Sequence, residues 1–188
     1  MEKLLKERES NGRAIWVNEP DEAGEIARRR DTAFNVALGK LLDTNGNLET
    51  VMQTGEAFGR GLFEDSIKEK PEKWTMEEWL SSTVEHIFNP LGNAFTFSEI
   101  ADDEVKSLMT RCPLHENTNE PHVASLFTYG FMRGLLLSAF PHGELLMGDI
   151  VETEGRPKTE FIFKTNALFK DRFERERVKS SFDITKKL

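Results

Sequence analysis

Hydrophobic side chains recur at helical spacing through the first half of the chain, which predicts three successive helices. They cover about residues 21–42, 48–68 and 75–89. In the second helix, Gly55 and Gly59 fall on the apolar side, so another backbone can approach closely there. Thr75 is placed to cap the third helix, and Asn89-Pro90 is expected to stop it. The first half is therefore helical.

The second half changes to the period-two alternation of strands. Four strands are expected, over residues 93–99, 104–112, 144–152 and 158–165. Each pair is close enough in sequence to form a hairpin, and a mostly buried apolar helix over residues 121–140 separates the two hairpins. The pattern predicts an α+β protein with a four-stranded antiparallel sheet of two hairpins, packed with helices. We expect residues 1–45 to form a helical N-terminal extension, residues 46–166 the α+β domain, and residues 167–188 a basic helical tail.

The N-terminal extension contains a short apolar run, Ile15-Trp16-Val17, in otherwise polar surroundings. This run is expected either to add an edge strand to the sheet or to clasp a partner. Together, this run and the apolar face of the first helix present more apolar surface than a small sheet domain needs for its own core. We therefore predict a homodimer in which this extension takes part.

Charge and cysteine content narrow the classes of function. The net charge of −8 argues against broad binding to a phosphate backbone. Acidic residues interleave with the basic ones of the tail, so a solvated helix is favoured there over a nucleic-acid patch. The single cysteine allows no internal disulfide, and no apolar run is long enough to span a membrane. A cytoplasmic protein that binds neither membrane nor nucleic acid is expected.

Several short motifs of the second half resemble a known family. They are Thr110-Arg111-Cys112-Pro113 with Glu116, Tyr129-Gly130 with Gly134, Gly148-Asp149, and the segment from Gly155 to Phe163. Together with the order of elements, they resemble the small-molecule-binding domain of the bacteriochlorophyll 4-vinyl reductase type and the related 2-amino-thiazoline-carboxylate hydrolase-like proteins. The resemblance covers about residues 48–165. It implies an α+β fold that binds a small molecule.

Aromatic residues are concentrated where such a ligand would lie. A cavity between the sheet and the second and fourth helices is expected to be lined by Phe95, Phe97, Phe127, Tyr129, Phe131, Phe140, Phe161 and Phe163. An ordinary packed core explains the same residues. Gly130 and Gly134 are expected to have no room for a side chain, against the sheet or a ligand. Tyr129 and Arg133 are candidates to hydrogen-bond the ligand's polar end, although Arg133 equally suits a surface position near glutamates.

Cys112 is the residue with the most chemical alternatives. With His115 and His122, and with Glu116 as a fourth ligand, it could hold zinc. Alternatively, Cys112 is a small buried hydrophobe and the histidines are surface loop residues. As a nucleophile, Cys112 would need a nearby histidine as base and a lowered thiol pKa.

These observations favour the binding of a small, largely apolar ligand or a tetrapyrrole-like cofactor, in a sensor or carrier. Two alternatives stay open. One is a hydrolase or reductase-related enzyme that uses Cys112 and nearby histidines. The other is a scaffold subunit whose N-terminal extension engages a partner.

Overall fold

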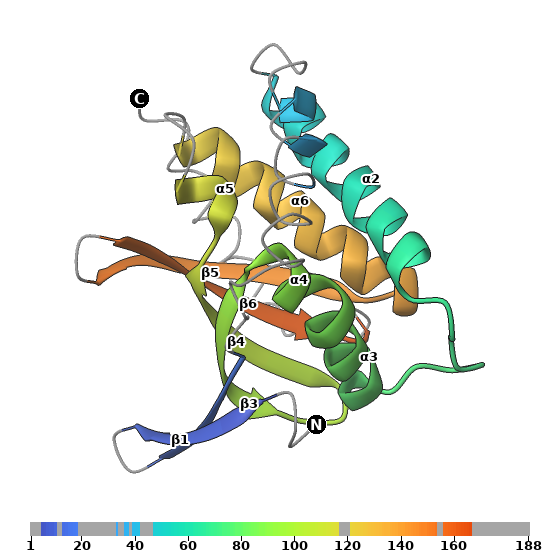
Figure 1. Ribbon diagram of the computed structural model, residues 1–188, viewed down its shortest axis with the longest axis vertical. Helices are drawn as coiled ribbons and strands as arrows, with labels where there is room; N and C mark the ends of the chain where they lie inside the picture. The colour runs from blue at the N-terminus through green and yellow to red at the C-terminus, as the bar shows by residue number, and fades with distance from the viewer. Residues whose placement is uncertain are drawn as a thin grey trace.

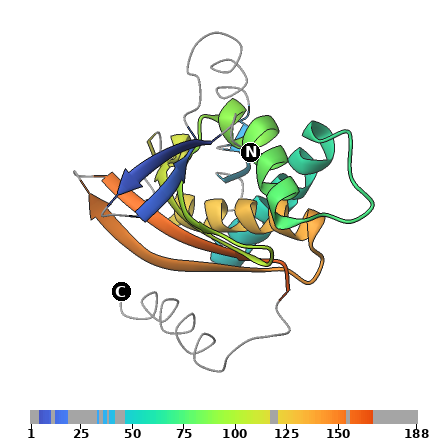
Figure 2. The same ribbon diagram turned by 90° about the horizontal axis from the view of Figure 1, so that it is seen from below.

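The computed structural model describes residues 5–10, 13–18, 33, 36–37, 39–41, 47–116, 121–153 and 156–166. The molecule has two layers, a twisted antiparallel sheet and a group of helices on one side of it (Figure 1 and Figure 2). The tail predicted over residues 167–188 lies outside the described residues, as does most of the first predicted helix. Positions 33, 36–37 and 39–41 of that helix are described, and they are helical.

The strands come as three pairs along the chain, and helices lie between one pair and the next. The elements are β1 (Lys6–Ser10), β2 (Arg13–Val17), α2 (Leu48–Ser66), α3 (Met76–Thr83), the π-helical turn η1 (Val84–Phe88), α4 (Asn89–Leu91), β3 (Ala94–Ile100), β4 (Glu104–Arg111), α5 (Pro113–Glu116), α6 (Pro121–Ala139), β5 (Glu144–Thr153) and β6 (Arg156–Lys164). The described residues thus confirm the α+β class.

The sheet has six strands in the order β1-β2-β3-β4-β6-β5, and every neighbouring pair is antiparallel. The predicted count of four strands is wrong, because it contained the two C-terminal hairpins and missed the hairpin β1–β2. The apolar run of β2 does join the sheet, through the pairs Trp16↔Phe97 and Val17↔Thr96. It lies one strand inside the edge, because β1 covers it. The strand β1 reads Lys-Glu-Arg-Glu-Ser and has no apolar alternation to reveal it, as is common for charged edge strands.

The segment after α2 forms one continuous helical rod from α3 through η1 to α4. Its start is as predicted: Thr75 and Glu78 form a capping box, in which each side chain accepts a hydrogen bond from the other residue's backbone N–H. The Glu78 carboxylate accepts hydrogen bonds from the backbone N–H of Thr75 and from the Thr75 hydroxyl, and these bonds, the backbone one first, lower its pKa. The predicted stop at Asn89-Pro90 is wrong. The rod continues through Pro90, which lies at the start of α4, and ends where Gly92 adopts a left-handed φ of 75°.

The core lies between the sheet and the helices. The helix-facing positions of the central strands are buried, namely Phe95, Phe97, Val105, Ser107, Met109, Phe161 and Phe163. The fully buried Trp79 of α3 packs its ring 5.2 Å from that of Phe163, and its indole Nε1 donates to the carbonyl oxygen of Leu135 in α6 at 3.2 Å. The period-two alternation of the strands therefore predicts the buried face correctly.

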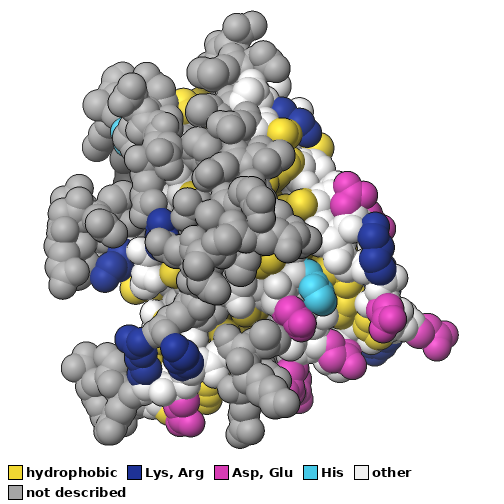
Figure 3. Space-filling view, in the orientation of Figure 1, with side chains coloured by type: hydrophobic (Ala, Val, Ile, Leu, Met, Phe, Trp, Pro, Cys, Tyr) yellow, Lys and Arg dark blue, Asp and Glu magenta, His cyan; other side chains and the backbone are white. Residues whose placement is uncertain are grey.

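Acidic residues are prominent near α3 on the face of the molecule drawn in Figure 3. The stretch from the end of α2 to η1 has several such exposed residues, among them Glu64, Asp65, Glu69, Glu72, Glu77 and Glu85, and the exposed lysines Lys68, Lys70 and Lys73 lie in the same stretch. Among the described residues, no helix is long and apolar enough to cross a membrane.

Candidate ligand cavity

A cavity of about 50 Å³ lies where α2 and α6 meet the rim of the β3–β4 hairpin. Its described lining comes from five parts of the chain and consists of Ala33, Ala37, Phe58, Leu91, Asn93, Cys112, Pro113, Leu114, Phe127, Thr128 and Phe131. Eight of these side chains are purely apolar. None of the described lining residues carries a charge.

The walls are positioned by an unusually close contact between α2 and α6, which run side by side in Figure 1. A Cβ atom at Gly55 or Gly59 would come within 3.0 Å of the backbone of Phe127 or Phe131. The contact is reciprocal, because Gly130 and Gly134 of α6 meet the backbone of α2 in the same way. The prediction that Gly130 and Gly134 leave no room for a side chain is therefore confirmed, and the neighbour is the backbone of α2 rather than the sheet.

Three aromatic rings line the cavity beside this glycine contact. The Phe58 ring lies 5.9 Å from that of Phe127 and 5.7 Å from that of Phe131, both in tilted geometry. The ammonium of Lys40 lies 5.4 Å from the Phe58 ring centre, a cation–π contact that helps to hold this ring. The apolar wall is thus built on the two helices that the glycines bring together.

The polar groups of the lining cluster at the rim of the sheet. The cross-strand pair Ala94↔Arg111 places the next residues, Asn93 and Cys112, side by side. The Cys112 sulfur lies 3.7 Å from the hydroxyl oxygen of Thr128, and either atom can donate. An amide, a thiol and a hydroxyl therefore meet at one end of an otherwise apolar cavity.

Only some of the predicted ligand-binding residues line this cavity. Cys112, Phe127 and Phe131 do, whereas Gly130 and Gly134 lie in the helix contact beside it. Phe140, which was also expected there, is buried in the core and does not line it. Phe95, Phe97, Phe161 and Phe163 belong to the core below α3 and α6 and do not line it. The sequence analysis missed Phe58, Asn93 and Thr128. Thr128 could have been noticed because its hydroxyl stands in an apolar stretch of helix. Asn93 could have been noticed because it directly follows Gly92, which ends a helix.

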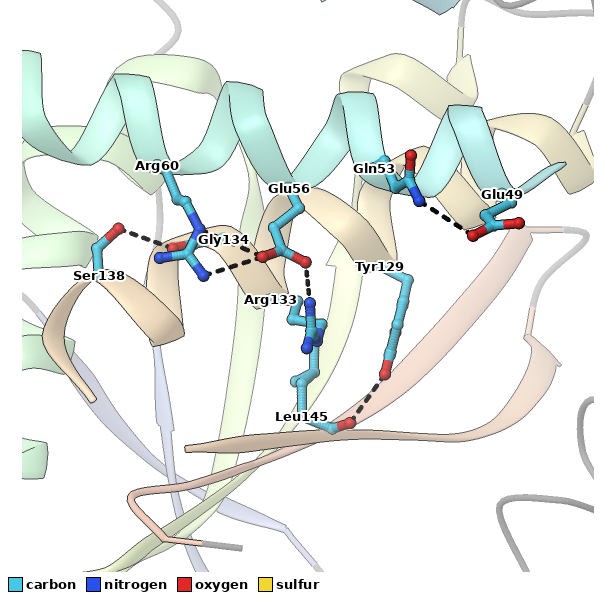
Figure 4. Close-up of polar contacts among 9 residues, drawn as sticks. All are labelled: Glu49, Gln53, Glu56, Arg60, Tyr129, Arg133, Gly134, Ser138 and Leu145. Carbon is cyan, nitrogen blue, oxygen red and sulfur yellow. Dashed lines mark hydrogen bonds and ion pairs between the residues drawn. The ribbon is translucent and has the colours of Figure 1, made fainter. Parts of the chain in front are cut away.

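Tyr129 and Arg133 contact the protein itself in this structure (Figure 4). The Tyr129 hydroxyl donates to the carbonyl oxygen of Leu145 in β5 at 3.1 Å, and burial raises the pKa of this phenol. Arg133 forms an ion pair with Glu56 of α2, and Glu56 also binds Arg60 at 2.9 Å. These contacts link α6 to β5 and to α2. The sequence analysis offered a position near glutamates as the alternative to ligand binding for Arg133, and Glu56 is such a glutamate.

The histidines near Cys112 are not arranged around the thiol. In α5, the backbone N–H of His115 donates to the Cys112 carbonyl oxygen at 3.0 Å, while its side-chain Nε2 is buried without a hydrogen-bond partner. Burial lowers the pKa of His115, and a hydrogen bond to the backbone of Ala124 opposes this. His122 is exposed. Within the described ranges, no three His, Cys, Asp or Glu side chains come together as a metal site, so Cys112, His115 and His122 do not form one there.

Comparison with family models, curated proteins and solved structures finds no match to this chain.

Proposed function

We propose that the protein binds a small, largely apolar molecule in the cavity between α2, α6 and the β3–β4 hairpin, as a sensor or carrier. The observation that carries the proposal is the composition of the lining, in which apolar and aromatic walls surround a few convergent polar groups. Binding sites for small molecules typically have this composition. Cys112, the one cysteine of the chain, is buried and lines this cavity. A reducing compartment would keep its thiol from forming a disulfide with another molecule.

The size of the cavity favours a small apolar ligand over a tetrapyrrole-like cofactor. Pockets that hold drug-sized ligands have volumes of roughly 300–1,000 Å³, and a tetrapyrrole would need at least as much. At about 50 Å³, the cavity suits a molecule of only a few non-hydrogen atoms. We therefore propose a small ligand and do not extend the proposal to a tetrapyrrole.

Native mass spectrometry of the purified chain tests the proposal. We expect a bound molecule that is released when the protein unfolds. Ala37→Leu should reduce this occupancy, because Ala37 lines the cavity and the larger side chain would fill it. Ala57→Leu is the matched control, since it makes the same change at an exposed position of α2. A bound zinc ion at one per chain, or a bound molecule unaffected by Ala37→Leu, would contradict the proposal.

A further inference from the structure

The Asn93 side chain is the most unusual group in the cavity wall. Only 5% of this residue is exposed, yet its side-chain amide makes no hydrogen bond to any part of the chain that the structure describes. Neither atom of the amide is among the fully enclosed polar atoms that lack a partner in the described residues, so the amide borders the accessible space of the cavity. An unpaired amide in the wall of a cavity is therefore a group available to a ligand.

The backbone of Asn93 is hydrogen-bonded on both sides, which fixes the point from which the side chain extends. Its N–H donates to the carbonyl oxygen of Phe88 at 2.9 Å, as part of the turn that ends α4. Its carbonyl oxygen accepts a hydrogen bond of 2.8 Å from the buried side chain of Asn18. The side chain is thus the only part of Asn93 whose hydrogen-bonding groups are not already used.

The neighbours of Asn93 define what it can bind. Cys112 and Thr128 add a weak donor and a hydroxyl beside it, and the three Phe rings leave only apolar contacts for the rest of a ligand. A charged ligand would lose its hydration without gaining an opposite charge among the described lining residues. The ligand should therefore be uncharged, with a single polar end.

An amide such as that of Asn93 has one acceptor and two donor hydrogens, and it pairs best with a group that also donates and accepts. We propose that the cavity takes a short, uncharged molecule whose polar end is a primary amide or a group of the same donor–acceptor pattern, held by Asn93 with Thr128 and Cys112 beside it. This inference rests on the proposed function. It adds the chemical class of the ligand and the residue that selects it.

Nuclear magnetic resonance titrations of the full chain test the inference with four probes. Propionamide has the required pattern, butanone of the same shape only accepts, propionate is charged, and xenon is an apolar probe of the cavity. We expect propionamide to bind about tenfold more tightly than butanone, which is the scale of one additional hydrogen bond. Propionate should not bind in the cavity.

The variant Asn93→Leu has nearly the same size and removes the amide. It should weaken propionamide binding by about tenfold and leave xenon binding unchanged. If it does not fold, Thr128→Val removes the adjacent hydroxyl at constant shape, and it should also weaken propionamide binding without affecting xenon. Equal affinity for propionamide and butanone, or an unchanged affinity of the variant for propionamide, would overturn the inference. If xenon still bound the cavity, the proposed function would stand. Failure of xenon and of the other probes to bind the wild-type cavity would overturn both.

Discussion

Gly59 of α2 lies directly against the backbone of Phe131 in α6, with no space between them for a methyl group. A Cβ atom at Gly59 would come within 3.0 Å of the Phe131 carbonyl oxygen. Backbone atoms cannot move aside as the end of a flexible side chain can, so the two helices would have to separate. Phe131 also lines the cavity, and the spacing of these helices therefore fixes one of its walls.

Gly59→Ala should destabilise the protein by about 1–3 kcal/mol through overpacking, despite the better helix propensity of alanine. Gly61→Ala, in the same helix, is the control, because a Cβ atom there would meet nothing within 4 Å. That variant should be stabilised by up to about 1 kcal/mol. Urea unfolding measures both, and changes of the same sign would contradict the glycine contact.

Asn18→Ala should cost about 2–3 kcal/mol, because it leaves buried backbone groups without partners. The Asn18 side chain accepts from the N–H of Phe95 at 2.6 Å, and it donates to the carbonyl oxygen of Asn93 and to the Asn89 side chain. It thus joins the end of β2 to β3 and α4. Thermal unfolding should show a clear loss of stability, whereas Ser98→Ala at an exposed position of β3 should change little. Equal melting temperatures for the two variants would show that this buried junction contributes no stability.

Tyr129 should ionise only above pH 10, the ordinary value for a phenol. Burial raises its pKa, and donation to the Leu145 carbonyl oxygen also favours the neutral form. Because the unfolded chain releases this proton first, stability should fall as the pH rises through 10. The chain has one tyrosine, so the change in ultraviolet absorbance on titration reports this residue alone. An ionisation midpoint at pH 10 in the folded protein would mean that the phenol is open to solvent.

His115 should make the protein less stable in mild acid. Burial lowers its pKa in the folded state below the unfolded value of about 6.5, so the unfolded chain binds the proton more readily. Its contribution to stability is complete above pH 6.5 and is lost as the pH falls towards the folded-state pKa. His115→Gln should flatten the dependence of unfolding free energy on pH between 8 and 5. An unchanged pH dependence in His115→Gln would indicate that the ring is accessible to water.

The sequence predicts best those features that depend on periodicity within one element. The spacing of Gly55 and Gly59 was sufficient to predict a close backbone approach, and the alternation around Phe161 and Phe163 predicted the buried side of β6. The identity of the partner was not predictable, because the meeting of α2 with α6 depends on tertiary packing between segments about 70 residues apart.

The sequence was least informative where side chains from distant elements converge. The cavity combines Phe58 of α2, Thr128 of α6 and Asn93 from the loop between α4 and β3, and no spacing in the sequence relates them. The hairpin β1–β2 was missed for a different reason, since a polar edge strand has no hydrophobic pattern. The predicted homodimer stays a prediction. Deleting residues 1–19 would remove two strands of the sheet, so light scattering of the intact chain is the better measurement.

A crystal structure of the protein, freed of any co-purified molecule and held under xenon pressure, tests the central claim most directly. Xenon enters apolar cavities and shows where a small molecule can be held. We predict one xenon atom in contact with Phe58, Phe127 and Cys112 in the wild-type protein, and its loss in Ala37→Leu. An empty cavity in the wild-type crystal, with these side chains packed as an ordinary core, would contradict the account.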